Sequence, residues 1–350
     1  MVNMSFKRDY MRFFAITLLL LFLLAGCARE KDESTRSIQE RILQAYLQLN
    51  YPDAEQTKSG LVIVSSEPGN GKKPIEYGYA YMKYSTKDLN GNYTFTNCKD
   101  VAEQIGTYTA DGYYGPRLMS LGYGSTLQGV NEAMMMMNKG AKMTVIVPPW
   151  LSNYDGNYNY AGTTVESQTS AVSVIYELEM GDVVDKPLDF QLDSLESYRD
   201  KYFPGLDSTA KGYYFKKLEG TVEDTVVAEN VVKVYYIGRL LDGYIFDTNI
   251  ADTAKKYGIY NSAKKYNPLE VTIKPTFSQM TSTGSADGTS SGDTYVEGFA
   301  RAIKSMTYGD KAVTFFWSDM GYGELNNNTN GVGVPGYSML RFDIRMLPKE

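Results

Sequence analysis

The sequence predicts an α+β protein of two tandem modules, each an antiparallel β-sheet wrapped on a short helix and each preceded by a further helix. A set of Gly, Tyr and Pro positions recurs in the same order in both halves of the chain. Runs of alternating β-branched and aromatic residues, which are typical of strands, occur in both halves. Short stretches with apolar residues three and four positions apart are typical of helices with one buried face.

The two halves are related by a constant offset along the sequence. Gly60 corresponds to Gly212, 152 positions later, and Gly140 corresponds to Gly309, 169 positions later. An offset that is constant on either side of one jump indicates a duplication with a single net insertion. The insertion falls on the polar run at 276–292, whose composition cannot bury enough apolar surface to become ordered. We therefore expect a mobile surface loop there.

The N-terminal segment predicts export and lipidation. Basic residues near the start of the chain precede the apolar run 13–24, a signal-peptide pattern that is short for a membrane-spanning helix. The run ends in Leu24-Ala-Gly-Cys27, which resembles the bacterial lipobox. This resemblance implies a signal peptide at 1–26 and a diacylated Cys27 that begins a tether at 27–36. An uncleaved anchor helix is the alternative.

A lipobox implies an outer-membrane lipoprotein on the periplasmic face or the cell surface, held to the lipid membrane through acylated Cys27. Lys31-Asp-Glu33 resembles the acidic surface-export signal of Bacteroidetes lipoproteins. A solvated tether explains this short motif nearly as well, so the sequence does not decide between the periplasmic face and the cell surface.

The composition excludes several kinds of chemistry. His is absent, which excludes His-based triads, His general bases and His metal ligands. With Cys27 lipidated, Cys98 is the single remaining thiol, so neither an intrachain disulfide nor a thiolate zinc site can form. The net charge of −6 and the lack of a basic stripe argue against nucleic acid as a partner. We expect no metal and no cofactor.

Each module is expected to begin with a helix. Ser37 and Glu40 have the spacing of a capping box, and apolar residues at three- and four-residue intervals follow them. A matching helix is predicted over about 192–202, ending before a proline because the residue before proline disfavours helical geometry. The module boundaries are accordingly 37–185 and 190–350, and each module is long enough to bury its own core.

The second module has the clearest pattern. Residues 231–240 alternate β-branched and aromatic side chains, a Leu-Leu-Asp-Gly turn follows, and a short return strand ends at Phe246 and Asp247. Apolar residues at helical spacing predict a helix over 296–306, and 312–317 is predicted to be another strand.

Together these stretches resemble the FKBP-type peptidyl-prolyl cis-trans isomerase family. The resemblance implies a prolyl isomerase and folding helper that acts on proline-containing envelope or secreted polypeptides. This reaction needs no nucleophile, metal or proton shuttle, because its barrier of about 18–20 kcal/mol comes from amide resonance that is lost as the C–N bond twists. An apolar, water-poor site that holds the twisted bond lowers this barrier by differential binding.

The resemblance also implies a site for the prolyl bond in the second module. Phe299 stands where the family most often has Trp and would form the pocket floor, and Tyr322 would donate a hydrogen bond to a substrate carbonyl. Asp247 would lie near the twisting carbonyl and accept a hydrogen bond from Tyr236. The remaining substrate-binding positions are Phe246, Val296 through its backbone amide, Val334 and Phe342. Taken singly, each phenylalanine is equally well explained as a core residue.

The first module is expected to be a degenerate copy. The carboxylate, the aromatic floor and the last phenylalanine of the second module are matched there by Thr96, Val130 and Val174. Aromatic character is kept at Tyr84 and Phe95, with Tyr154 as a further candidate. Losing the floor and the carboxylate together suggests a role in binding or packing, so we expect catalysis in the C-terminal module.

Two other functions stay open. The same fold could serve as a non-catalytic chaperone or protein-binding lipoprotein. A surface glycan-binding lipoprotein is the alternative from another class, since the chain has 30 tyrosines. Most of them are expected in strands, because Tyr packs well on a pleated sheet.

Overall fold

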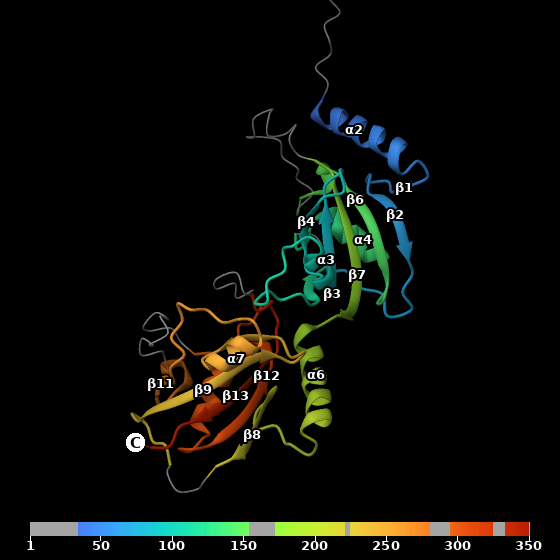
Figure 1. Ribbon diagram of the computed structural model, residues 1–350. Helices are drawn as coiled ribbons and strands as arrows, with labels where there is room; N and C mark the ends of the chain where they lie inside the picture. Colours follow the sequence, from blue (N-terminus) through green and yellow to red (C-terminus); the bar gives the residue numbers. More distant parts are fainter. Residues whose placement is uncertain are drawn as a thin grey trace, which may run out of the picture.

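The structure, a computed structural model, describes residues 34–122, 124–153, 172–220, 225–280, 295–324 and 333–349. Figure 1 shows two units that follow one another along the chain, each built on its own sheet. Every strand pair within the described residues is antiparallel. The predicted α+β architecture of two tandem antiparallel modules is confirmed.

The first unit opens with helix α2 (Thr35–Asn50). Its strands are β1 (Glu55–Gln56), β2 (Val62–Glu67), β3 (Tyr79–Lys87), β4 (Tyr93–Thr96), β5 (Arg117–Ser120), β6 (Lys142–Val147) and β7 (Val174–Val184). Its other helices are α3 (Lys99–Gln104), α4 (Gln128–Met136) and the 3-10 turn η1 (Pro149–Leu151). The strands lie in the order β1-β2-β6-β7-β3-β4, and β5 also pairs with β3.

The second unit opens with helix α6 (Pro187–Tyr202). Its strands are β8 (Tyr213–Glu219), β9 (Val231–Leu240), β10 (Ile245–Thr248), β11 (Leu269–Thr272), β12 (Lys311–Phe316) and β13 (Leu340–Met346). Its other helices are α7 (Ala251–Lys256), α8 (Glu297–Lys304) and the 3-10 turns η2 (Phe277–Gln279) and η3 (Ser318–Met320). The strands lie in the order β10-β9-β13-β12-β8, and β11 also pairs with β9.

Apart from β1 in the first unit and η2 in the second, the described elements of the two units correspond in order. From Arg117 of β5 to Leu269 of β11 the offset is 152, and from Gln128 of α4 to Glu297 of α8 it is 169. The net insertion therefore falls between β11 and α8, where the sequence predicts it. The prediction of a mobile surface loop over 276–292 is wrong in its first part, because Met280 is fully buried in the core of the second unit. Residues 281–294 lie outside the described part of the chain.

Both leading helices begin earlier than predicted. The N-cap of α2 is Ser34, whose Oγ accepts a hydrogen bond from the Ser37 amide at 3.2 Å. Glu40 pairs with Arg36 one turn away, so the expected capping box is wrong. Helix α6 begins at Pro187, since proline is tolerated in a first turn where its missing N–H has no intrahelical acceptor.

Each sheet has its own core beneath its short central helix. The buried cluster of the first unit is drawn from residues 43–183, and that of the second from residues 213–346. In the second unit α8 lies close to β12 because it carries Gly298: a Cβ there would lie 2.3 Å from the ring of Phe316. Among the described residues, no helix has the length and apolar character needed to cross a bilayer.

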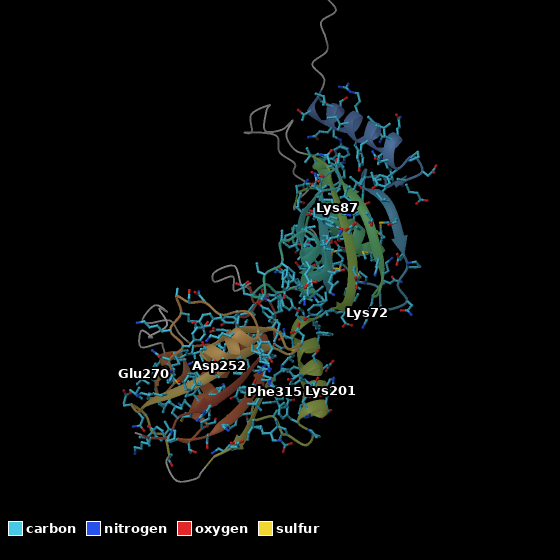
Figure 2. The ribbon with its side chains drawn as sticks, viewed as in Figure 1. Lys72, Lys87, Lys201, Asp252, Glu270 and Phe315 are labelled. Atoms are coloured by element: carbon cyan, nitrogen blue, oxygen red, sulfur yellow. The ribbon has the colours of Figure 1, made fainter. Side chains whose placement is uncertain are left out.

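Helix α6 covers the opposite face of the second sheet. Leu195 of this helix is buried against Tyr214 of β8 and Phe315 of β12. Figure 2 shows Phe315 on the side of the sheet that carries α6. The Tyr214 and Phe315 rings stack at 4.8 Å between centroids. The second sheet is therefore sandwiched between α8 and α6.

Candidate functional site

Phe342 of β13 lies at the centre of an aromatic cluster in the second unit. Its ring centroid is 4.9 Å from that of Phe299 and 5.8 Å from that of Phe246. Tyr236 lies 6.2 Å from Phe342, and Tyr322 lies 6.4 Å from Phe246 in an edge-to-face arrangement. The fold thus brings together five of the residues that the sequence predicts for the site. We call these five residues the aromatic cluster.

A glycine makes room for this cluster on the sheet. Gly238 of β9 is directly opposite Phe342 of β13 in the strand register. A Cβ at Gly238 would lie 2.7 Å from the ring of Phe246 and 3.0 Å from that of Phe342. The rings of Phe246 and Phe342 therefore lie over a backbone position that no side chain could share.

Phe299 lies at the base of the cluster, on the first turn of α8. It is 4% exposed, and its ring meets that of Tyr236 edge to face at 5.6 Å. Val296 is the N-cap residue of the same helix. The amide of an N-cap residue has no intrahelical acceptor, so the Val296 N–H is available to a ligand at this end of the helix.

The Asp247 carboxylate is bound on both oxygens. Tyr236 Oη donates a 2.5 Å hydrogen bond to Oδ2, and Lys264 Nζ donates one of 2.5 Å to Oδ1. The Asp247 side chain remains 41% exposed. Sequence reasoning missed Lys264, because it lies in the loop after α7, 17 residues from its partner. No local pattern in the sequence indicates this ion pair.

Asn249 fixes the strand that carries Tyr236. Its Oδ1 accepts a hydrogen bond from the Tyr236 amide at 2.8 Å, and its Nδ2 donates to the Val234 carbonyl at 3.0 Å. Asn97 makes the same two bonds in the first unit, to Tyr84 and Met82. A buried asparagine 13 residues after a strand tyrosine, present in both repeats, is a signal that sequence reasoning could have used.

These asparagines correct the predicted alignment of the repeats. Asn97 and Asn249 are 152 positions apart, which places Phe95, not Thr96, at the position of Asp247. The strand register agrees: Phe95 is opposite Thr86 in the first unit, and Asp247 is opposite Gly238 in the second. The expectation of Thr96 at the Asp247 position is therefore wrong by one residue, and the carboxylate is replaced by an aromatic ring.

The predicted match between Val174 and Phe342 is also wrong. Phe342 is opposite Gly238, and in the first sheet Tyr176 is opposite Thr86, which is the residue equivalent to Gly238. Tyr176 is therefore the counterpart of Phe342. The offset between the repeats is 169 at Lys142 and Lys311, where β6 and β12 begin, but 166 at Tyr176 and Phe342, so the segments that lead into the last strands differ in length by three residues.

The first unit has its own aromatic stack at the equivalent place. Tyr84 stacks on Phe95 at 5.1 Å and on Tyr176 at 6.4 Å between centroids. Phe95 is 42% exposed, and Val130 is buried at the floor position. This stack has a small floor, and the residue at the position of Asp247 is the phenylalanine.

The remaining predicted residues are placed as follows. Val334 is buried in the same core cluster as Phe299 and Phe342. Cys27 and Tyr154 lie outside the described residues. Within the described ranges, no group of three or more Cys, Asp or Glu side chains is placed to hold a metal ion.

Comparison with known proteins points to one family. Residues 223–347 match the model of the FKBP-type peptidyl-prolyl cis-trans isomerases. Among solved structures, the chain is similar to the three FKBP domains of wheat FKBP73, with 16% identity, a TM-score of 0.28, and 83% of this chain and 95% of that chain covered. No curated protein matches the chain.

Two bacterial structures are also similar. FkpA from Escherichia coli is 16% identical, with 53% of this chain and 74% of that chain covered and a TM-score of 0.29. A peptidyl-prolyl cis-trans isomerase from Pseudomonas syringae pv. tomato is 21% identical, with 47% and 96% covered and a TM-score of 0.30. The family assignment rests on the match over 223–347.

Proposed function

We propose, because residues 223–347 form an FKBP-type peptidyl-prolyl cis-trans isomerase domain, that the second unit isomerises X-Pro bonds of envelope or secreted polypeptides. The observation that carries the site assignment is the Tyr236–Asp247–Lys264 arrangement beside the aromatic cluster. The apolar rings favour the twisted bond, and a carboxylate held in one orientation beside them can position the substrate backbone.

The aromatic cluster supplies an apolar surface for the proline ring. As the C–N bond twists, the amide loses resonance, and its carbonyl becomes less polar. Phe299, Phe246 and Phe342 favour this twisted, less polar state over the planar state that water solvates well. Lowering the barrier by about 5 kcal/mol would accelerate the reaction several thousand-fold.

The polar groups at the rim hold the substrate backbone. We assign to Tyr322 and to the Val296 amide the donation of hydrogen bonds to substrate carbonyls. We assign to Asp247 a position beside the twisting carbonyl, where its orientation is set by Tyr236 and Lys264. Charge-assisted hydrogen bonds of this kind are short and directional, so the carboxylate keeps one orientation.

For the first unit we propose a role in binding without catalysis. Phe95 at the position of Asp247 removes the carboxylate, and Val130 at the position of Phe299 leaves a small floor. The exposed Phe95 ring favours contact with apolar polypeptide segments. We place the boundary between the units before Pro187, since α6 packs on the second sheet.

The location in the envelope is proposed from the sequence. The signal-peptide pattern and Leu24-Ala-Gly-Cys27 support a lipoprotein anchored through acylated Cys27, in the outer membrane on its periplasmic face or at the surface. In this location unfolded polypeptides arrive with their prolyl bonds not yet in the native isomer, and a tethered isomerase would act on them.

The test is an isomerase assay with residues 28–350 as a soluble protein. A short peptide with one Ala-Pro bond is followed by NMR exchange between its cis and trans signals. We expect catalysed exchange that the Tyr322→Phe variant reduces. Exchange at the uncatalysed rate, together with binding of unfolded protein, would instead establish the non-catalytic chaperone.

A further inference from the structure

A cleft of about 320 Å³ lies between the two units. Tyr81 and Leu118 line it from the first unit, Phe190 from α6, and Leu240 and Met339 from the second unit. Tyr81 of β3 is directly opposite Leu118 of β5, so both side chains leave the same face of the first sheet. The cleft is mainly apolar and needs both units to exist.

Tyrosine contacts hold the two sides of the cleft together. The rings of Tyr113 and Tyr244 meet edge to face at 5.2 Å between centroids. Tyr113 Oη donates a hydrogen bond to Asp242 Oδ2 at 3.1 Å, and Tyr244 Oη donates one to the Asp111 carbonyl at 2.5 Å. Each unit therefore donates a tyrosine hydrogen bond to the other, and these bonds fix the two walls of the cleft relative to one another.

Tyr81 gives the cleft a polar group. Its ring lies 5.7 Å from that of Phe190, and its hydroxyl makes no hydrogen bond to any described residue. Burial, and to a smaller extent Asp182, raises the pKa of this hydroxyl to about 12. Tyr81 therefore stays protonated at neutral pH and can donate a hydrogen bond to a carbonyl of a bound chain.

The charges of the cleft are acidic. Its ionisable lining consists of Asp182, Asp242 and tyrosines, and no Lys or Arg of the described residues lines it. Asp182 forms an ion pair with Lys139 outside the cleft, whereas Asp242 accepts hydrogen bonds from neutral donors only, the Tyr113 hydroxyl and the Tyr244 amide. Arg117 lies near Tyr113 and Tyr244 but does not line the cleft. The charged side chains that do line it are both carboxylates, and this favours a basic group beside an apolar one.

The cleft and the aromatic cluster share the β9–β10 hairpin. Leu240 lines the cleft and is buried in the same core as Phe299 and Phe342. The hairpin turn that carries Asp242 leads directly to Phe246. The β9–β10 hairpin therefore carries both a wall of the cleft and a residue of the aromatic cluster, so one polypeptide bound at the cluster lies close enough to reach the cleft.

We propose that this cleft is a second binding site for the same polypeptide, taking an apolar side chain next to a basic residue while Tyr81 donates to its backbone. This inference rests on the proposed isomerase function. It makes the substrate class more specific: unfolded segments in which an apolar residue with a basic neighbour lies some way from the proline. It also gives the first unit a share in substrate binding.

The test compares a short peptide with extended versions of it, using residues 28–350. The short one carries a single Ala-Pro bond, and the long ones extend it at either end by a Gly-Ser spacer and Lys-Leu-Lys. We expect the better long peptide to show roughly tenfold lower KM and Kd than the short one, the scale expected for burying one leucine side chain. A Lys-Ser-Lys version is expected to lose the gain.

Leu118→Asp places a charge in the cleft and is expected to abolish the gain while leaving turnover of the short peptide unchanged. Leu49→Asp, on the exposed side of α2, is the matched control and is expected to keep it. Tyr81→Phe keeps the ring but removes the hydroxyl, and it is expected to lose part of the affinity gain of the long peptide. This variant provides the test if Leu118→Asp does not fold.

The proposal is overturned if the long peptides show no gain, or if the Leu118→Asp and Tyr81→Phe variants keep it in full. Failure of the isomerase function is a separate result. If the wild-type protein does not isomerise the short peptide, fluorescence anisotropy still measures the Kd of labelled long peptides. Weaker binding by the Leu118→Asp and Tyr81→Phe variants would then support the cleft, and unchanged binding would overturn it.

Discussion

Tyr236 donates a 2.5 Å hydrogen bond from its hydroxyl to the carboxylate of Asp247, 11 residues further along the chain. The two meet because the hairpin between β9 and β10 folds the return strand beside the tyrosine. Lys264 binds the other carboxylate oxygen, so Asp247 lies between a neutral donor and a cation. In the first unit, Tyr84 instead meets the Phe95 ring.

We expect Asp247→Asn to lower kcat/KM on a proline peptide between tenfold and hundredfold, because a hydrogen bond to a charged group contributes about 1.5–3 kcal/mol. The melting temperature should change little, since the side chain is 41% exposed. Tyr236→Phe removes the same hydrogen bond from the other side. The double variant should therefore lose less than the sum of the single losses, and fully additive losses would contradict the pairing.

Phe299→Ala should destabilise the second unit by about 3–5 kcal/mol, because a buried aromatic ring is lost and a cavity is left among its neighbours. Urea denaturation followed by fluorescence measures this change. Phe95→Ala in the first unit is the control: that ring is 42% exposed, so its loss should cost much less. Equal losses for the two variants would show that Phe299 is not a core position.

Stability should fall above pH 10 in a way that depends on Tyr213. Burial raises the pKa of its hydroxyl from the ordinary value of 10.0 to about 12. The folded protein holds this proton more tightly than the unfolded chain, so the contribution is complete below pH 10 and is lost as the pH rises to 12. Tyr213→Phe should flatten the slope of unfolding free energy against pH in this window. Tyr257→Phe, at an exposed position, is the matched control.

Cys27→Ser should release the protein from the membrane fraction. The motivation is the order of the charged segment, the apolar run 13–24 and Leu24-Ala-Gly-Cys27. Cell fractionation and the mass of the mature chain measure the outcome, with Cys98→Ser as the matched control. Two results together would favour an uncleaved anchor helix: the Cys27→Ser protein stays in the membrane fraction, and the mass of the wild-type chain shows no acyl groups.

Much of the second unit could be predicted from its sequence because its signals are local. The alternation in 231–240 and the Leu-Leu-Asp-Gly turn give β9 and its hairpin directly. The apolar spacing gives α8 within a few residues of its observed bounds. The change of offset from 152 to 169 also locates the main insertion between β11 and α8.

The misses come from contacts between residues far apart in sequence. Lys264 reaches Asp247 through a loop, and only the folded chain shows the pair. The predicted equivalences of Thr96 and Val174 are wrong because strand register is set by backbone hydrogen bonds between strands, which residue type alone does not reveal. The capping residue of α2 is Ser34 and not Ser37; both are serines close to the helix start, and residue type alone does not decide between them.

The most direct test of catalysis by the second unit alone is to assay residues 34–185 and 186–350 separately, the latter keeping α6 whole. Cis-trans exchange of an Ala-Pro peptide is measured at equal concentrations of each fragment, after circular dichroism has shown that both are folded. We expect residues 186–350 to carry the activity and residues 34–185 to leave exchange at the uncatalysed rate. Equal rates, or a faster N-terminal fragment, would contradict the assignment of the site to Asp247, Phe299 and Tyr322.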